Sequence, residues 1–110
     1  MRKLALPVAA IAVAAGVVAL PSTAATKPKP RQVAVKDDFF GPKKITISKG
    51  VKVVWTWKGK RTHNVSEANG KFGSGNKKKG TYSHTFKTKG TYLLFCTRHA
   101  PDMQMTVKVK

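Results

Sequence analysis

The stretch from Tyr92 to Val107, YLLFCTRHAPDMQMTV, contains the only cysteine of the chain, followed closely by a histidine and two methionines. Cys96 ends a segment with strand-like alternation, His99 lies in the loop after it, and Met103 begins the next segment. A thiolate, an imidazole and a thioether form the soft donor set that suits copper in a trigonal site with a long axial sulfur bond. The stretch therefore predicts a copper site at the junction of two strands.

A trigonal copper site needs a second nitrogen ligand, and His63 in the sequence RTHNV is the best candidate. His63 is far from Cys96 along the chain, so the fold must bring two remote segments together. A Cys-x2-His pattern alone is a weak signal, but His63 ahead of it and Met103 behind it strengthen the prediction. Met105 is the alternative axial ligand; we prefer Met103 because it lies closer to the loop that holds His99.

The remaining chemistry-bearing residues do not form a catalytic group. The third histidine, His84, lies between Tyr82 and Phe86 on one face of a predicted strand, which is a packing position. The four acidic residues are scattered along the sequence, and no nucleophile is paired with a base. We therefore leave His84 out of the metal site and expect no catalytic turnover.

Seven short segments alternate apolar with polar residues, as strands with one buried face do, and no segment has a useful helical period. Turn signals recur at the spacing typical of β-sandwiches. We expect an all-β antiparallel sandwich with a turn at 37–42, a hairpin around Gly50, and a solvated loop at 69–80 anchored by Phe72. The expected strands are 32–36, 44–48, 51–57, 63–67, 80–86, 90–96 and 103–110.

Residues 1–25 have the three parts of a secretory signal peptide: a basic start, an apolar run from Leu4 to Leu20, and small residues up to Ala25. The apolar run is shorter than the roughly 20 residues that a membrane anchor needs. We expect cleavage near Ala25 and an exported protein of the bacterial periplasm, envelope or exterior, with no transmembrane segment left. A flexible basic arm over 26–31 and one domain over 32–110 would follow.

The chain is strongly basic, with 22 Lys and Arg against four acids and a formal net charge of +18. Binding to polyanions is therefore an alternative function. The basic residues are spread through every segment, however, and Trp55 and Trp57 fall on a predicted core face, so exposed aromatic rings for base stacking are lacking. We expect no specific nucleic-acid partner. A lone cysteine cannot form an internal disulfide, and a bound metal would supply stability instead.

The sequence resembles the cupredoxin family, the small blue copper proteins similar to plastocyanin, amicyanin and pseudoazurin, over essentially all of residues 33–109. Two departures from the family pattern, Trp57 and Met105, remove no ligand. The positions that carry the resemblance are Phe40, Pro42, Ile45, Thr46, Ile47, Gly50, Val53, Trp55, His63, Asn64, Val65, Ser74, Gly75, residues 82–86, residues 90–92, Cys96, Thr97, His99 and Met103.

The resemblance implies a Greek-key sandwich that binds one copper ion through His63, Cys96 and His99, with Met103 axial. It also implies transfer of single electrons between redox partners as the function. Storage or delivery of copper in the cell envelope is an alternative that would use the same ligands.

The resemblance further implies two roles for residues around the ligands. The side chain of Asn64 would bridge to the loop around Thr97, and the exposed edge of His99 would be the electron gate. Ala100 and Pro101 would form a small apolar docking surface beside it.

Basic residues flank the two histidines of the predicted site, namely Lys60, Arg61 and Arg98. A redox partner with acidic groups around its own centre would be steered to this end, and salt would weaken the association. We expect the protein itself to be a monomer.

Overall fold

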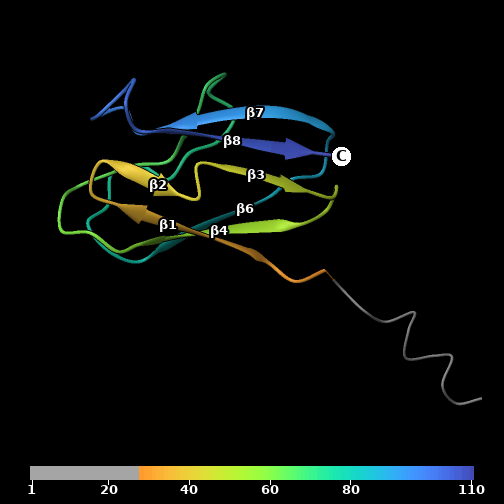
Figure 1. The fold of residues 1–110 in the computed structure, drawn as a ribbon, viewed down its shortest axis with the longest axis horizontal. Helices are drawn as coiled ribbons and strands as arrows, with labels where there is room; N and C mark the ends of the chain where they lie inside the picture. The colour runs from red at the N-terminus through yellow and green to blue at the C-terminus, as the bar shows by residue number, and fades with distance from the viewer. Residues whose placement is uncertain (1–27) are drawn as a thin grey trace, which may run out of the picture.

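Alternation of buried and exposed residues along each strand builds a sandwich of two four-stranded sheets (Figure 1). The computed structural model describes residues 28–110. The first sheet has the order β2-β1-β4-β6 and the second β3-β8-β7-β5. The strands are β1 (Arg31–Lys36), β2 (Phe39–Gly41), β3 (Lys44–Ile47), β4 (Lys52–Trp57), β5 (Ser66–Glu67), β6 (Thr81–Thr85), β7 (Gly90–Phe95) and β8 (Gln104–Val109).

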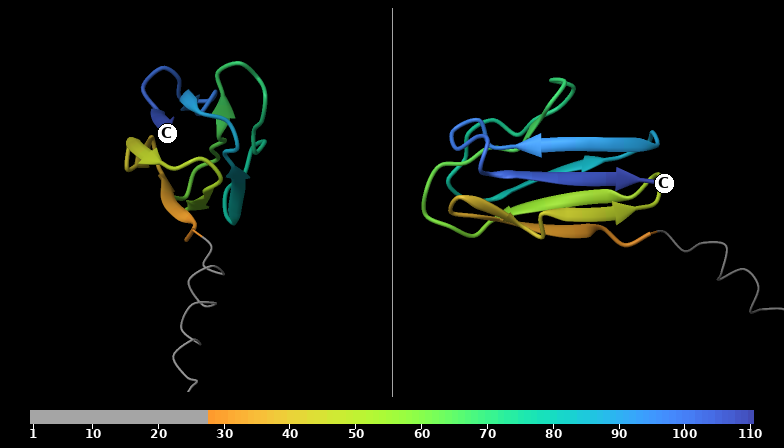
Figure 2. Two further views of the ribbon diagram at one scale, coloured as in Figure 1. Left: turned by 90° about the vertical axis from the view of Figure 1, so that its right-hand side faces the viewer. Right: turned by 45° about the horizontal axis from the view of Figure 1, so that its top comes forward.

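The core lies between the inner faces of the two sheets. Trp55 at 0% exposed and Trp57 at 6% face inward from β4, as predicted. Met105, Val107 and Val109 form the buried stripe of β8, also as predicted. The remaining buried apolar residues come from both sheets, and Figure 2 shows the strands running side by side along the length of the sandwich.

The predicted all-β sandwich is confirmed, but its sheets are mixed. β1 pairs with β4 in parallel, and β3 pairs with β8 in parallel, whereas the other strand pairs are antiparallel. Each parallel pair joins two strands of one sheet between which the chain visits the other sheet: β3 of the second sheet lies between β1 and β4 in the sequence, and β4 and β6 of the first sheet lie between β3 and β8.

The predicted hairpin around Gly50 is wrong. β3 and β4 belong to different sheets, and the segment between them bonds to both: Lys49 N donates to Lys110 O, and Gly50 N donates to Phe86 O. Gly50 has a φ of 94°, a conformation in which glycine avoids the Cβ clash of other residues. The chain therefore crosses the sandwich at Gly50 instead of folding back within one sheet.

Two local predictions also need correction. Residues 39–41, predicted to be part of a turn, form the edge strand β2, which pairs with β1 through Val35 and Phe40. The strand predicted over 63–67 is reduced to β5, while His63 makes only an isolated bridge to Lys77. The chain thus has eight strands over the described residues rather than seven.

The N-terminal predictions fall mostly outside the described residues. The predicted signal peptide, 1–25, lies entirely outside them. Of the predicted arm, residues 28–30 are exposed and lack regular structure, while Arg31 already belongs to β1. Within residues 28–110, no helix has the length and apolar character needed to cross a membrane.

Candidate metal centre

Three segments remote in the sequence meet at the end of the sandwich opposite the C-terminus. In Figure 1 this end holds the turn between β1 and β2, the loop after β4 and the blue loop after β7. His63 lies in the segment after β4, Cys96 directly after β7, and His99 three residues further on. One ligand atom from each of these residues lies within 4.8 Å of the others. The structure therefore brings together the three side chains singled out in the sequence.

The loop that carries Cys96 and His99 is closed by its own backbone. His99 N donates to Cys96 O at 3.1 Å, Met103 N donates to His99 O at 3.3 Å, and Cys96 N donates to Met103 O at 3.0 Å. These bonds turn the chain back between β7 and β8. The closed loop presents the cysteine and the histidine on one side.

The buried donors of this group suit a soft metal ion. Cys96 and His63 are fully buried, and Cys96 Sγ lies 4.0 Å from His63 Nδ1. His99 Nε2 is buried without a hydrogen-bond partner, and within residues 28–110 it is the sole buried side-chain nitrogen or oxygen in that situation. Leaving such a group unpaired is unfavourable, so a metal ion there would satisfy it. One thiolate and two imidazoles are a donor set that fits copper.

The two methionines have different surroundings. The side chains of Met103 and Met105 are both buried, at 0% and 2% exposed. Trp55 Nε1 donates to Met105 Sδ at 3.3 Å, so the thioether of Met105 is engaged within the core. Met103 ends the loop that begins at Cys96.

Asn64 connects the His63 segment to the Cys96 loop. Its side chain donates to Thr97 Oγ1 at 2.8 Å and accepts from Thr97 N at 3.1 Å. Its backbone N–H donates to Cys96 Sγ at 3.4 Å. Ser66 Oγ and Asn76 Oδ1 complete its side-chain hydrogen bonds. The two segments that carry the three grouped side chains are thus tied together by short polar contacts.

Two acidic residues that the sequence analysis treated as scattered lie against the histidines. Asp37 Oδ1 is 3.0 Å from His63 Nε2, and Asp38 Oδ1 is 3.7 Å from His99 Nδ1. The hydrogen bond with His63, followed by those from the backbone N–H groups of Arg61 and Lys60, holds the pKa of Asp37 well below its usual range. No local motif indicated these contacts, because Asp37 and His63 are 26 residues apart.

The exposed part of this end carries mixed charge. The side chain of His99 is 26% exposed and lines a hollow of about 420 Å³ with Asp38, Arg61, Ala100 and Asp102. Arg61 Nη1 also bonds to Asp38 Oδ1 at 3.2 Å. The other predicted surface residues, Lys60, Arg98 and Pro101, are exposed.

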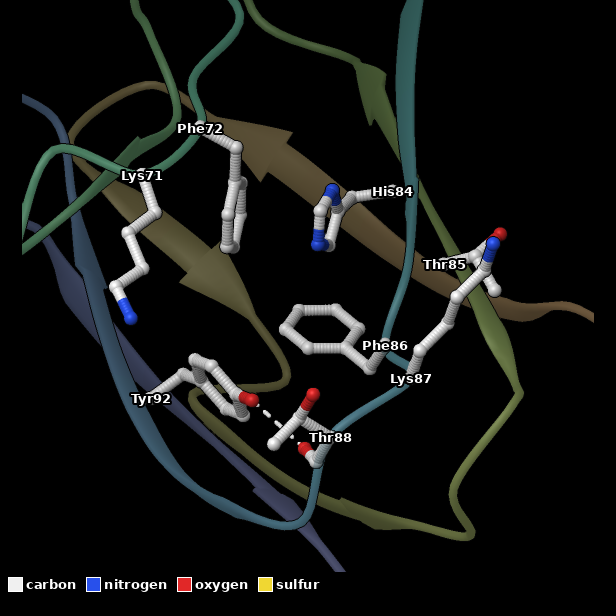
Figure 3. Close-up of a pocket in the computed structure, with 8 residues that line it drawn as sticks. All are labelled: Lys71, Phe72, His84, Thr85, Phe86, Lys87, Thr88 and Tyr92. Atoms are coloured by element: carbon white, nitrogen blue, oxygen red, sulfur yellow. Dashed lines mark hydrogen bonds between the residues drawn. The ribbon is translucent and has the colours of Figure 1, made fainter.

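His84 lies apart from the metal group and packs in an aromatic cluster (Figure 3). Its ring stacks on Phe72 at 3.7 Å between centroids and meets Phe86 edge-on at 4.8 Å. The predicted packing role of His84 and the predicted anchoring role of Phe72 are confirmed. Burial lowers the pKa of His84.

The comparisons with known proteins agree with this geometry. Residues 31–110 match the family described as copper binding proteins of the plastocyanin/azurin family. The chain belongs to that family. The predicted relationship to cupredoxins is therefore confirmed, and so is copper as the cofactor.

Solved structures similar to this cupredoxin include amicyanins. An oxidized amicyanin variant is 27% identical, with 73% of this chain and 81% of that chain covered and a TM-score of 0.66. A Cu(I) form of another amicyanin variant is 26% identical, with 79% and 88% covered and a TM-score of 0.63. A purple cupredoxin from Nitrosopumilus maritimus, 24% identical with 73% and 99% covered and a TM-score of 0.64, is similar in fold. No curated protein sequence matches the chain.

Proposed function

We propose that this cupredoxin is an exported type 1 copper protein that carries single electrons between redox partners. Copper would be held by His63, Cys96 and His99 with Met103 as the axial ligand. The observation that carries the proposal is the convergence of one buried cysteine and two histidines from remote segments, with only His99 partly open to solvent. Such a site admits an electron through one edge while excluding water from the donors.

Rigidity of the ligand segments supports a carrier rather than a store. The closed loop from Cys96 to Met103 and the bonds between Asn64 and Thr97 hold the donors in one arrangement. Copper supplies the one-electron chemistry when it is bound, and a fixed site changes little between its two charge states. We propose no turnover by the protein itself.

Met103 is the axial ligand in this proposal because the other thioether is already used. The indole N–H of Trp55 bonds to Met105 Sδ, whereas Met103 closes the loop that holds Cys96 and His99. Asn64 and Thr97 would hold the cysteine segment, since bonds behind the ligands orient them and tune the metal.

The partner would dock over His99. Ala100 and Pro101 are exposed beside it, and Lys60, Arg61 and Arg98 supply positive charge. We propose an acidic partner surface, with Asp38 and Asp102 next to His99 limiting how closely the partner's acidic groups can approach.

The test is a Cu(II) titration of the domain from Gln32 onward, preceded by its basic arm, with Cys96→Ser as the control. We expect an intense visible band from charge transfer between thiolate and copper, saturating at one ion per chain and missing in the control. A reversible one-electron wave in voltammetry should accompany it. A band with no reversible wave, or copper that a weak chelator removes at once, would favour storage or delivery over electron transfer.

Export has its own test, because it rests on the sequence of residues 1–25. We expect the protein purified from the periplasm of a bacterial host to have lost those residues by mass spectrometry. Retention of Met1 in a protein found in the cytoplasm would overturn the proposed export.

A further inference from the structure

We propose that Asp37 is a positioning residue for the copper site, which fixes the orientation and tautomer of His63 and thereby favours binding of Cu(II). This inference rests on the proposed function, because it takes His63 to be a copper ligand. Among the described residues, Asp37 is hydrogen-bonded to His63 and to no other proposed ligand.

The two nitrogens of the His63 ring face different groups. Nε2 lies 3.0 Å from Asp37 Oδ1, while Nδ1 faces Cys96 Sγ at 4.0 Å. An ionised carboxylate can only accept, so the neutral ring must carry its proton on Nε2 and donate it to Asp37. That tautomer leaves the lone pair of Nδ1 free on the side where Cys96 lies. A carboxylate behind a histidine ligand also makes the ligand nitrogen more basic.

Asp37 is itself held by the loop after β4. Lys60 N donates to both carboxylate oxygens, at 3.0 and 3.1 Å, and Arg61 N donates to Oδ1 at 2.9 Å. The approach depends on Gly59, because a Cβ at this position would overlap the carboxylate and the backbone of Asp37. The turn before β2 and the loop after β4 therefore close on each other around one carboxylate.

The next residue reinforces the arrangement without touching His63. Asp38 adopts a left-handed backbone with φ 72° and pairs with Arg61. The turn thus directs the first carboxylate to the buried histidine and the second toward the surface. The side chain of Asp37 is 37% exposed against 0% for His63, so the contact also shields the buried ring from solvent.

The effect on copper follows from charge. A negative group hydrogen-bonded to a ligand stabilises the doubly charged ion more than the singly charged ion, so it tightens Cu(II) binding and lowers the reduction potential. Removing a bond of this kind typically weakens metal binding by roughly 10- to 100-fold. We expect a loss in this range, together with a rise in the midpoint potential, when Asp37 loses its charge.

The variant is Asp37→Asn, which keeps the shape of the side chain, and the control is Glu67→Gln, which removes the same charge. Glu67 lies in β5 and its carboxylate accepts from Lys71 N at 3.0 Å, and among the described residues no hydrogen bond links its side chain to a proposed ligand. Cu(II) affinity by chelator competition and midpoint potential would be measured for both variants. We expect both quantities to change in Asp37→Asn and to stay close to those of the unsubstituted protein in Glu67→Gln. Equal shifts in the two variants would reduce the effect to general charge and overturn the inference, as would no shift in either.

A second variant separates the local contact from the charge. Gly59→Ala keeps every carboxylate but pushes the loop away from Asp37. We expect it to weaken Cu(II) binding in the same direction as Asp37→Asn. Unchanged affinity in a folded Gly59→Ala protein would contradict the inference.

The tautomer of His63 can be read without copper. In the metal-free protein, nitrogen chemical shifts should show His63 protonated on Nε2, and Asp37→Asn should produce a mixture of tautomers. If the unsubstituted protein bound no copper, the proposed function would fail, yet these shifts would still decide whether Asp37 orients His63. A single unchanged tautomer in Asp37→Asn would overturn the positioning role even if copper bound normally.

Discussion

At the scale of single residues, two buried thioethers two positions apart have separable tasks. Met105 accepts the indole N–H of Trp55, whereas Met103 closes the loop of the proposed ligands. Met105→Leu should leave that N–H buried and unpaired and cost about 1–3 kcal/mol of unfolding free energy. It should keep the thiolate-to-copper band, because no proposed ligand is lost.

Met103→Leu should change the copper spectrum but have little effect on stability. Leucine and methionine have similar volumes, and the exchange usually costs less than about 1.5 kcal/mol of unfolding free energy in a core. The visible band and the midpoint potential should shift, while the metal-free protein should unfold close to the unsubstituted midpoint in urea. Spectra and urea curves of the two variants check the assignment. If Met105→Leu changed the spectrum and Met103→Leu did not, the axial ligand would be Met105.

The sequence alone predicts some residues of the candidate site but not others. Cys96, His99 and Met103 fall within eight residues, and their donor types alone indicate a soft metal. Asp37 gives no such signal, because an aspartate in a polar turn is ordinary and its partner His63 is 26 residues away. Only the closing of the turn before β2 against the loop after β4 makes this carboxylate part of the site.

At the scale of elements, alternation predicted which residues are buried but not which strands pair. Ile45 and Ile47 face the core as expected, yet β3 pairs with β8 rather than with β4. A short glycine-containing connection is compatible both with a hairpin and with a crossing between sheets. Long-range hydrogen bonds of this connection decide for the crossing: Lys49 N donates to Lys110 O, and Gly50 N donates to Phe86 O.

The loop between β5 and β6 is held to the sandwich by an aromatic stack that should respond to pH. Phe72 lies on the ring of His84, with Phe86 beneath, and Lys71 and Lys87 line the same hollow (Figure 3). Burial lowers the pKa of His84 below its ordinary 6.5, so the unfolded chain binds a proton more readily than the folded protein. The stability contributed by neutral His84 should be complete above pH 6.5 and decrease as the pH falls through the lowered pKa.

His84→Gln isolates this contribution. The variant should be less stable than the unsubstituted protein at pH 7.5, because the stack is lost. The difference in the free energy of unfolding between the two proteins should be smaller at pH 5.5. Urea unfolding of the metal-free proteins at the two pH values measures this difference. A difference in the free energy of unfolding that stays constant or increases at low pH would contradict burial as the cause of the lowered pKa of His84.

At the scale of the whole molecule, the net charge of +18 is distributed over all segments, but part of it is fixed at the metal end. The backbones of Lys77 and His63 are paired by two hydrogen bonds: Lys77 N donates to His63 O, and His63 N donates to Lys77 O, both at 2.9 Å. Trp57 N donates to Gly80 O and anchors the other side of the same loop. The exposed Lys78 and Lys79 are therefore held near the proposed ligands instead of moving freely with a solvated loop.

This placement predicts that electron transfer to an acidic redox protein depends on salt and on the position of the lysines. The Debye length is about 10 Å at 0.1 M salt, so attraction between exposed charges should decline steeply above that concentration. A variant with Lys78→Gln and Lys79→Gln should react more slowly at low salt, whereas Lys49→Gln with Lys110→Gln, at the far end of β8, removes equal charge where no ligand lies. Stopped-flow rates across a salt series would measure both. Equal slowing by the two pairs would indicate that total charge steers the encounter, and rates independent of salt would exclude electrostatic docking at the metal end.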